Sequence, residues 1–401
     1  MGFFDTLGVK CVNELAIREK RVLLRTDFNF PADENGNIAD FARMDKSIPT
    51  IKHILEHNAR LIIASHFGRP ESEKDVQYTL EPFAARLAEI LDQDIYFFED
   101  CVGMGAMQMV RDLKPGQILV LENLRFNPDE KKGTSAFARE LAKMCDVYIN
   151  DAFGVCHRKD TSIAVLPRFV DTKGVSFAAK QEIEELSKFL GLEHGNGFCI
   201  MLGGSNTTDK MGLIRPMLEI ADKIIVGGPL AYVFLAAKGE NIGATPVDEE
   251  KIPLAKEILK SAEVRKVEIV LPVDHIAAET VNSTEPVVCR TESFPEGMTA
   301  FDIGPETVEL FAGKAASCSH LFWSGPFGVY EKPQFSIGSL KLASQIAQFP
   351  IHKVAGGGNT DEMLRTAGVA GKFDYVFPSG TAALEFLKNN GSLPGIEALK
   401  D

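Results

Sequence analysis

The chain has 401 residues, of which 45% are hydrophobic and 25% are charged, as in an ordinary globular protein. One hydrophobic core rarely grows to this length, so two domains are predicted. The formal net charge of −13 disfavours nucleic acid as a partner, and no apolar run reaches the ~18 residues that a membrane span needs.

Short apolar runs alternate with segments of helical periodicity along the chain, which is typical of parallel α/β layers. In the first half, strands are predicted at 21–28, 60–65, 94–98, 117–122 and 146–151, with helices near 45–57, 80–92 and 135–144. In the second half, strands are predicted at 198–203, 223–227, 267–272, 320–324, 352–356 and 374–377, with helices near 209–219, 229–237, 249–261, 305–317, 338–348 and 360–367. The predicted fold class is α/β, with two doubly wound parallel-sheet domains joined by a linking helix.

The linking helix is predicted over 177–190, where apolar positions recur at helical spacing. It would join an N-terminal domain over 1–176 to a C-terminal domain over 191–385, and it could act as a rigid lever for hinge closure. The tail over 386–401 contains an apolar stretch at 393–396, and we expect it to dock back on the N-terminal domain.

The predicted strands of the first half end mostly in charged or polar side chains. These are Asp27 and Asn29, His66 and Arg69, Arg125, and the pair His157-Arg158. Ligands sit outside the carboxyl ends of the strands in open parallel sheets. Arginine also binds phosphate bidentately and stays charged at cellular pH. The pattern therefore predicts a site for a small, multiply charged anion, although a surface ion pair is the alternative for any single arginine.

The predicted strands of the second half end instead in glycine. The glycines are Gly203-Gly204, Gly227-Gly228, Gly325 and Gly356-Gly357-Gly358. No P-loop and no dinucleotide fingerprint is present. Bare backbone at strand ends, followed by helix N-termini, would let nucleotide phosphates approach main-chain N–H groups. A tight turn is the alternative for one glycine pair, but four such sites favour a nucleotide. Two unlike ligands on two domains are typical of a kinase.

The seven cysteines, at 11, 101, 145, 156, 199, 289 and 318, are scattered and odd in number. This spacing argues against a disulfide framework or a zinc site, and it favours reduced thiols in the cytoplasm. The start of the chain also lacks a secretory pattern. Cys156 beside His157 could be read as a nucleophile, but a buried core thiol is the favoured interpretation.

Several short segments, most of them at the predicted strand ends, occur along the chain in a characteristic order and spacing. They are Arg-Thr-Asp27-Phe-Asn29-Phe-Pro, Arg43, Ser-His66-Phe-Gly-Arg69-Pro, Leu-Glu-Asn-Leu-Arg125-Phe, Asn-Asp-Ala-Phe-Gly-Val-Cys-His157-Arg158, Leu-Pro-Val-Asp274, Asp302-Ile-Gly-Pro and Gly356-Gly-Gly. As a set they resemble the phosphoglycerate kinase family over nearly the whole chain. The resemblance implies two doubly wound domains joined by a helix. It also implies phosphoryl transfer between ATP and the carboxylate of 3-phosphoglycerate, a step of glycolysis, with Mg²⁺.

The resemblance implies three sets of site residues. The acid substrate would be held by Asp27, Asn29, Arg43, His66, Arg69, Arg125 and Arg158. The nucleotide would be held by Gly203, Gly204, Lys210, Gly227, Gly228, Pro326, Glu331, Gly356, Gly357, Gly358, Asn359 and Thr360, with Glu331 against the sugar. The catalytic set would be Arg43, Lys210, Gly357 and Gly380. We expect only small-molecule partners, a monomer, and a cytoplasmic location.

A carboxylate nucleophile is already ionised at neutral pH, since its unperturbed pKa is roughly 4. No general base is needed, so catalysis would consist of alignment and charge neutralisation.

The departures from the family pattern lie on the nucleotide side. Asn206 stands where the family has a lysine that contacts the transferred phosphoryl, and Asn359 stands where it has a carboxylate that takes part in magnesium binding. Ser324, Ser379 and Thr381 replace an asparagine and glycines. Asn359 could still offer a neutral oxygen to the metal. A kinase of this family, acting on 3-phosphoglycerate or a close phosphorylated or phosphonylated carboxylic acid, is the leading hypothesis. A diverged enzyme with another acceptor or donor, and a binding protein without turnover, remain open.

Overall fold

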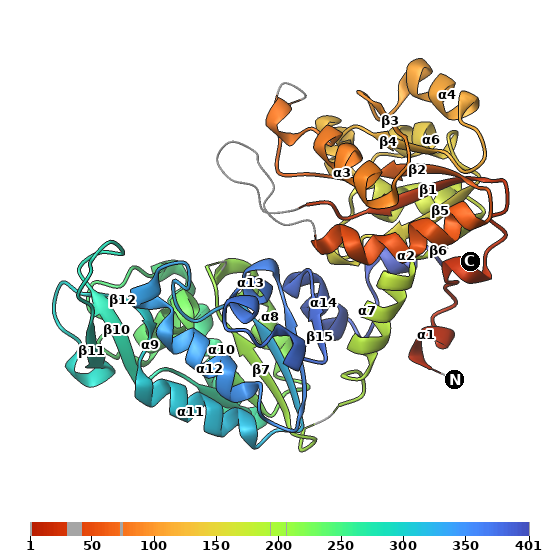
Figure 1. Ribbon diagram of the computed structural model, residues 1–401. Coiled ribbons are helices and arrows are strands. Elements are labelled where there is room, and N and C mark those ends of the chain that lie inside the picture. The colour runs from red at the N-terminus through yellow and green to blue at the C-terminus, as the bar shows by residue number, and fades with distance from the viewer. Residues whose placement is uncertain (1, 30–41, 73–74, 193, 206, 401) are drawn as a thin grey trace. The chain divides into compact units, whose positions relative to one another are not determined.

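The computed structural model describes residues 2–29, 42–72, 75–192, 194–205 and 207–400 (Figure 1). They form two compact units, the first made of Met1–Lys188 and Asn389–Asp401 and the second of Phe189–Lys388. The second unit is thus inserted near the end of the first. The predicted linking helix corresponds to α7 (Phe177–Ser187), which groups with the first unit and ends three residues earlier than expected.

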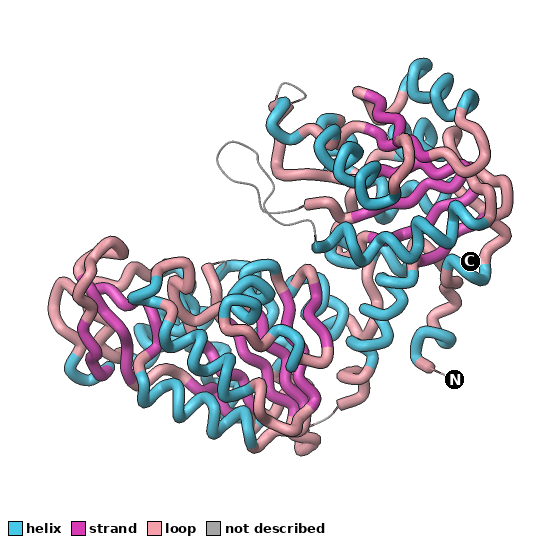
Figure 2. The backbone as a smooth tube through the Cα atoms, in the orientation of Figure 1, coloured by secondary structure: helices cyan, strands magenta, loops and turns pink. Residues whose placement is uncertain are grey.

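The first unit contains a six-stranded, fully parallel sheet (Figure 2). Its strands are β1 (Arg21–Thr26), β2 (Arg60–Ala64), β3 (Ile95–Phe98), β4 (Ile118–Leu121), β5 (Val147–Asp151) and β6 (Thr172–Val175), in the order β3-β4-β2-β1-β5-β6. The central strands β1, β2 and β4 are buried along almost their whole length, because helices cover both faces of the sheet.

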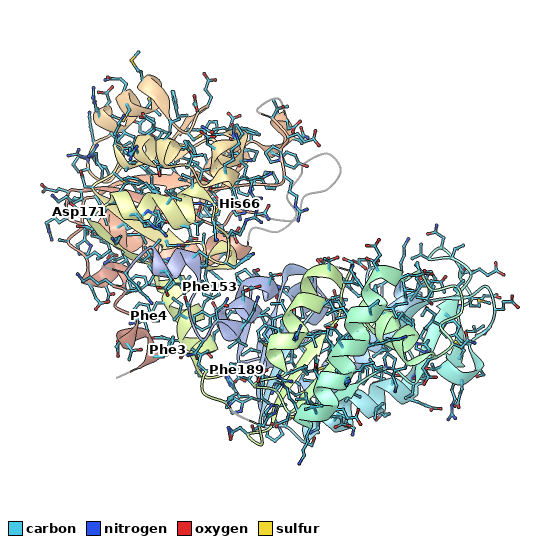
Figure 3. The ribbon with its side chains drawn as sticks, turned by 180° about the vertical axis from the view of Figure 1, so that it is seen from behind. Phe3, Phe4, His66, Phe153, Asp171 and Phe189 are labelled. Atoms are coloured by element: carbon cyan, nitrogen blue, oxygen red, sulfur yellow. The ribbon has the colours of Figure 1, made fainter. Side chains whose placement is uncertain are left out.

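Most helices of the first unit lie between these strands in sequence, while α1 (Phe3–Thr6) precedes β1 and α7 and α15 (Pro394–Glu397) follow β6. The others are α2 (Ala42–Glu56), α3 (Glu81–Leu91), α4 (Gly103–Asp112), α5 (Asp129–Lys132) and α6 (Ser135–Ala142). Short 3₁₀ or π turns are η1 (Val12–Glu14), η2 (Val76–Tyr78), η3 (Leu124–Phe126), η4 (Phe153–Val155), η5 (Thr161–Val165) and η6 (Leu166–Phe169). Near the N-terminus, Phe4 lies beside α7 (Figure 3), where the Lys180 Nζ sits 5.0 Å from the centre of its ring.

The C-terminal tail completes the first unit. Gly395 at the start of α15 donates its N–H to the carbonyl of Cys156 at 2.9 Å. A Cβ at Gly395 would lie 2.8 Å from Ile163 Cγ2, so glycine permits this close approach. Leu393 and Ile396 are buried beside it. The tail therefore packs against the loop that follows β5.

The second unit is built on another parallel sheet with a small antiparallel sheet beside it. The parallel strands are β7 (Phe198–Leu202), β8 (Lys223–Val226), β9 (Glu268–Val270), β13 (His320–Ser324), β14 (His352–Gly356) and β15 (Tyr375–Phe377), in the order β15-β14-β13-β7-β8-β9. The antiparallel strands are β10 (Asp274–Ala278), β11 (Val287–Arg290) and β12 (Thr299–Ile303), in the order β11-β10-β12. The two parallel sheets confirm the predicted fold class, and the antiparallel sheet was not predicted.

Helices cover both faces of the second parallel sheet (Figure 2). They are α8 (Thr207–Met217), α9 (Gly228–Lys238), α10 (Ile252–Arg265), α11 (Pro305–Ala316), α12 (Ile337–Ile346), α13 (Gly358–Thr366) and α14 (Gly380–Lys388), with the turns η7 (Glu249–Lys251), η8 (Thr291–Ser293), η9 (Pro333–Phe335) and η10 (Ala370–Lys372). Trp323 and Phe311 are fully buried in the core between β13 and α11. No described helix is both long and apolar enough to cross a bilayer.

One family-like string of this unit, the one that contains Asp274, has a structural role. The Asp274 carboxylate accepts the backbone N–H groups of Glu306 and Thr307 at 2.9 and 2.7 Å. Those groups belong to the first turn of α11, which otherwise lacks internal partners. Asp274 therefore joins β10 to the start of α11.

Candidate active site

The polar strand ends of the first unit come from four neighbouring strands. Because the sheet order runs β4-β2-β1-β5, the residues that follow these strands share one edge of the sheet. Asp27 and Asn29 follow β1, His66 and Arg69 follow β2, Arg125 follows β4, and Arg158 follows β5. The topology thus places the predicted acid-binding residues on adjacent loops.

Direct contacts join the loops after β1 and β2. The Asn29 Oδ1 accepts the N–H of Gly68 at 2.9 Å, and the Asp27 Oδ1 lies 3.7 Å from His66 Nε2. Gly68 has a φ of +62°, and a Cβ there would overlap the Tyr78 ring. Glycine is therefore required at this turn, and Asn29 fixes the turn against β1.

A buried cation that the sequence analysis did not single out orients His66. The Arg25 Nη2 lies 3.2 Å from His66 Nδ1, and Arg25 is fully buried on β1. A guanidinium can only donate, so Nδ1 is the acceptor and a neutral imidazole carries its proton on Nε2. Arg25 is in turn 3.7 Å from the buried Glu130 carboxylate. His66, visible in Figure 3 within the first unit, thus has Nε2 as its donor atom.

Two guanidinium groups face each other across the loops after β4 and β5. The Arg125 Nη1 donates to the carbonyl of Gly68 at 2.6 Å, and Arg158 Nε lies 3.0 Å from Asp160 Oδ2. Asp160 is also 3.8 Å from Arg125 Nη2. Burial, and next the positive charge of Arg158, lower the pKa of Arg125 to about 10. One carboxylate shared by two arginines leaves an excess of positive charge, which an anionic ligand would relieve.

The two remaining predicted acid-site arginines are less defined by contacts. Arg69 is exposed at the end of the β2 loop. Arg43 belongs to the first turn of α2, but its side chain lies outside the described residues.

In the second unit, the glycines at the strand ends pack the backbone tightly. A Cβ at Gly203 would lie 2.8 Å from the carbonyl oxygen of Gly325, and a Cβ at Gly227 would overlap the Phe327 ring. The N–H of Gly203 donates to Ser324 O at 2.9 Å, and that of Gly204 donates to Pro326 O at 2.7 Å. The N–H groups of Gly203 and Gly204 are therefore already hydrogen-bonded, and these glycines permit the close approach of β7 to β13.

Lys210 occupies the junction of these strand ends. From the first turns of α8, its Nζ donates to the carbonyls of Gly203 and Ser324, the latter at 2.9 Å. Burial lowers the pKa of Lys210 to about 8. Among the described residues, the ammonium donates to neutral carbonyl oxygens, and an anion nearby would stabilise its charged form.

Helix starts supply further N–H groups. Gly358, Asn359, Gly380 and Thr381 stand in the first turns of two helices, where backbone N–H groups have no acceptor within the helix. The first two open α13 and the others open α14, which are the places where anions bind most readily. Gly357, before α13, has a φ of +107°, a conformation that favours glycine.

Thr360 and Ser324 hold these helix starts to the strand ends. The Thr360 Oγ1 accepts the N–H of Gly325 at 2.8 Å and donates to Gly356 O at 2.9 Å. A Cβ at Gly380 would overlap the Ser324 hydroxyl. Ser379 Oγ accepts the N–H of Ala382 at 3.2 Å and so caps α14. Two of the departures, Ser324 and Ser379, are therefore accommodated by local packing and hydrogen bonds.

A pocket of about 350 Å³ opens beside these elements. It contains five predicted nucleotide residues, namely Gly204, Gly228, Pro326, Glu331 and Asn359. Its apolar walls include Tyr232, Pro246, Phe301 and Val329, which the sequence analysis missed. The remaining predicted residues, Gly203, Lys210, Gly227, Gly356, Gly357, Gly358 and Thr360, are not among those that line it. Flat apolar walls with a few polar groups suit an aromatic ligand such as a nucleobase.

A buried carboxylate supports the loop at the mouth of this pocket. The Ser339 hydroxyl accepts the N–H groups of Phe327 and Gly328 at 3.1 and 2.8 Å, and it lies 3.2 Å from Asp302. Asp302 also accepts the N–H of Gly338 at 2.7 Å. Burial raises the pKa of Asp302 to about 7. This explains the Asp302 string as a support for the pocket wall.

The remaining sequence hypotheses have simple outcomes. Asn206 lies outside the described residues, while Asn359 is exposed and Thr381 is half-buried in the first turns of α13 and α14. Cys156 is buried, accepts a hydrogen bond from Asn150 Nδ2 at 3.4 Å, and has a pKa that burial raises to about 12. A thiol of this kind is not a nucleophile at neutral pH.

Comparisons with known proteins agree on one family. The family model described as phosphoglycerate kinase matches residues 12–390. A phosphoglycerate kinase of Anaeromyxobacter dehalogenans is 41% identical over 398 residues, covering 98% of this chain and 100% of the relative. One of Koribacter versatilis is 38% identical, with 97% and 98% covered. The solved structure of phosphoglycerate kinase from Coxiella burnetii aligns with a TM-score of 0.82 and 31% identity, over 98% of each chain.

Proposed function

Because the chain belongs to the phosphoglycerate kinase family, we propose that it transfers a phosphoryl group between ATP and the carboxylate of 3-phosphoglycerate through the residues described above. The observation that carries the assignment of the acid site is the pair of guanidinium groups, Arg125 and Arg158, which share the single carboxylate of Asp160. This pair follows β4 and β5, on the same edge of the sheet as the donor Nε2 of His66.

The acid substrate binds the first unit. Arg125 and Arg158 bind its phosphate, since guanidinium forks match phosphate oxygens. His66 donates from Nε2, and the Asp27 carboxylate, 3.7 Å away, accepts from a hydroxyl of the acid. Asn29, Arg69 and Arg43 complete the set. The acid is thereby held by charge and oriented by the neutral donors.

The nucleotide binds the second unit. Its base lies in the apolar pocket against Tyr232 and Phe301, and its sugar reaches Glu331. Its phosphates meet Lys210 and the N–H groups that open α13 and α14. These groups would stabilise the negative charge of the phosphoryl in transit, which is the main contribution that a protein makes to such a reaction.

Magnesium fits this site only as a companion of the nucleotide. In the described residues no cluster of three His, Cys, Asp or Glu side chains could hold a metal ion. Asn359, exposed at the start of α13, offers one neutral oxygen. Mg²⁺ commonly keeps its waters and binds through substrate phosphates with one or two protein ligands. The ion would neutralise phosphate charge when bound, with Asn359 as its protein ligand. We propose that the protein acts as a monomer, because each ligand has its residues within one chain.

The test is a coupled assay in both directions with 3-phosphoglycerate, ATP and Mg²⁺. We expect turnover with 3-phosphoglycerate, and a large loss in Arg158→Met but not in Arg139→Met, which removes an equal charge from the exposed face of α6. Tight binding of both ligands without turnover would instead identify a binding protein. Turnover with a different phosphorylated acid alone would identify a diverged acceptor.

A further inference from the structure

Two cysteines of the second unit form a buried pair that the proposed phosphoryl transfer does not use. Cys199 lies on β7 and is fully buried, and Cys318 follows α11 and is 5% exposed. The two thiols lie close enough to affect each other's acidity, and the Cys318 thiol donates to the Lys314 carbonyl at 3.4 Å. Both cysteines belong to one core cluster between the sheet and α11. The chain thus brings together two sulfurs that are far apart in the sequence.

The ammonium group of Lys223 lies next to this pair. Lys223 on β8 is in register with Cys199, so both side chains lie on the same face of the sheet. The Lys223 Nζ lies 3.8 Å from Cys318 Sγ and 3.0 Å from the hydroxyl of Ser317. Ser317 is exposed, so the edge of the pair reaches the surface. A small, water-sized reagent could reach Cys318 here.

The two thiols differ in acidity. The neighbouring Cys199 thiol, and next Lys223, lower the pKa of Cys318. The Cys318 thiol and burial raise the pKa of Cys199. Burial raises the pKa of each of the other five cysteines. Cys318 is therefore the cysteine best able to form a thiolate, the species that reacts with oxidants.

We propose that Cys199 and Cys318 are an oxidative modification site, in which a peroxide converts the two thiols into an intramolecular disulfide. The Cys318 thiolate attacks one peroxide oxygen. The S–O bond forms, the O–O bond breaks, and hydroxide leaves and takes a proton to become water. Cys199 then gives up its proton and attacks the sulfenic sulfur, forming the S–S bond and releasing a second hydroxide as water. The two sulfurs together lose two electrons to one peroxide, and an added dithiol reverses the reaction.

This disulfide would join the start of β13 to β7. The two strands are hydrogen-bonded neighbours, and their far ends carry Gly203 and Gly325. Oxidation would thus lock the strands at the end opposite the nucleotide residues. The inference does not depend on the proposed kinase activity.

The test treats the full-length protein with stoichiometric hydrogen peroxide at pH 7, blocks free thiols, and maps peptides without a reductant. We expect a linked peptide containing Cys199 and Cys318 before oxidation at any other cysteine, and its loss on addition of dithiothreitol. The link should be absent in Cys318→Ser and retained in Cys289→Ser, which removes a cysteine elsewhere in the same unit.

Lys223→Gln keeps both sulfurs and tests the cation directly. Loss of the cation should slow the linking reaction about fivefold at pH 7 if it raises the thiol pKa from about 7 by about one unit, with recovery at higher pH. Lys341→Gln, which removes a surface cation paired with Glu309, should react like the parent chain. The proposal is overturned if the folded parent chain gives over-oxidised Cys318 without a link, or if another cysteine reacts first. An unchanged rate in Lys223→Gln would also overturn it.

Discussion

Lys210 allows the nucleotide site to be tested by proton counting. Burial lowers its pKa from 10.5 to about 8. A nucleotide phosphate next to the ammonium would favour the charged form and return the pKa toward its ordinary value. Full recovery of about 2.5 pKa units corresponds to ~3.4 kcal/mol of binding energy as an upper limit.

The sign follows from which form binds. Below pH 8 the free protein already carries the charged lysine, so affinity is full. Above pH 8 binding must take up a proton, so affinity falls as the pH rises. With a free pKa of about 8, uptake should be ~0.5 proton per nucleotide at pH 8, and the dissociation constant should rise about tenfold between pH 7 and pH 9.

Calorimetric titration with ADP and Mg²⁺ at these pH values, in two buffers of different ionisation enthalpy, measures both quantities. Lys210→Met should abolish the proton uptake near pH 8 and flatten the pH dependence. Lys341→Met should leave both unchanged, since that cation lies on the surface of α12. Because the nucleotide phosphates titrate equally in every variant, they cancel in the comparison. Zero uptake in the parent protein, or an undiminished slope in Lys210→Met, would refute the placement of the phosphates beside Lys210.

Three further predictions follow from other residues. Asn206→Lys should raise turnover about tenfold, because a cation at the transferred phosphoryl group is expected to add ~1.4 kcal/mol of transition-state stabilisation. Steady-state kinetics should show the higher turnover with unchanged affinity for the acid. An unchanged turnover would mean that the absence of the lysine does not limit the reaction. Arg158→Met should weaken 3-phosphoglycerate binding roughly 10- to 100-fold through loss of a charged hydrogen bond, and binding to the parent protein should weaken with added salt. Calorimetry in low and high salt measures both effects, with Arg139→Met as the control. Equal losses of affinity in the two variants would contradict the proposed acid site. Burial raises the pKa of Asp302, so its contribution to stability is complete below about pH 4 and is lost as the pH rises through about 7. The free energy of unfolding of Asp302→Asn, measured with urea, should therefore depend less on pH over this range than that of the parent protein. The same pH dependence in both proteins would count against burial of Asp302 as the cause.

The alternation of strands and helices could be predicted because it depends on local periodicity. The strand ends of the first unit could be predicted for the same reason: Arg125 and Arg158 lie in the loops after buried apolar strands, and parallel topology places these loops on one edge. Arg25 was missed because it lies within the apolar run of β1. Only the tertiary structure shows that its guanidinium meets His66 and Glu130.

Elements with weak local signals were missed. α4 begins with Gly103 and contains Gly105, and glycine disfavours helices. A Cβ at Gly105 would lie 2.5 Å from Phe98 Cζ, so packing against β3 explains why glycine is there. The antiparallel sheet β10–β12 comes from short segments separated by loops, and with it the pocket wall at Phe301 was missed.

The glycine-rich strand ends show the limit of sequence reasoning most clearly. A glycine in the sequence indicates that the backbone lacks a side chain there, but it does not show which N–H groups already donate to an acceptor within the protein. Gly204 donates to Pro326 across two strands that are more than a hundred residues apart in sequence. The N–H groups of Gly203 and Gly204 are therefore in use, whereas Gly358 and Asn359, which were also predicted, open α13.

The insertion of the second unit into the first has a consequence for synthesis on the ribosome. Residues 189–388 are made before the tail that completes the first unit. At ~5–20 residues per second this interval lasts roughly 10–40 s. The second unit can fold during that time, while the nascent first unit still exposes the surface around Ile163 that Gly395 and Ile396 later cover. A premature stop codon near the end of the gene would therefore damage the acid-binding half of the protein, although that half is the first to be translated.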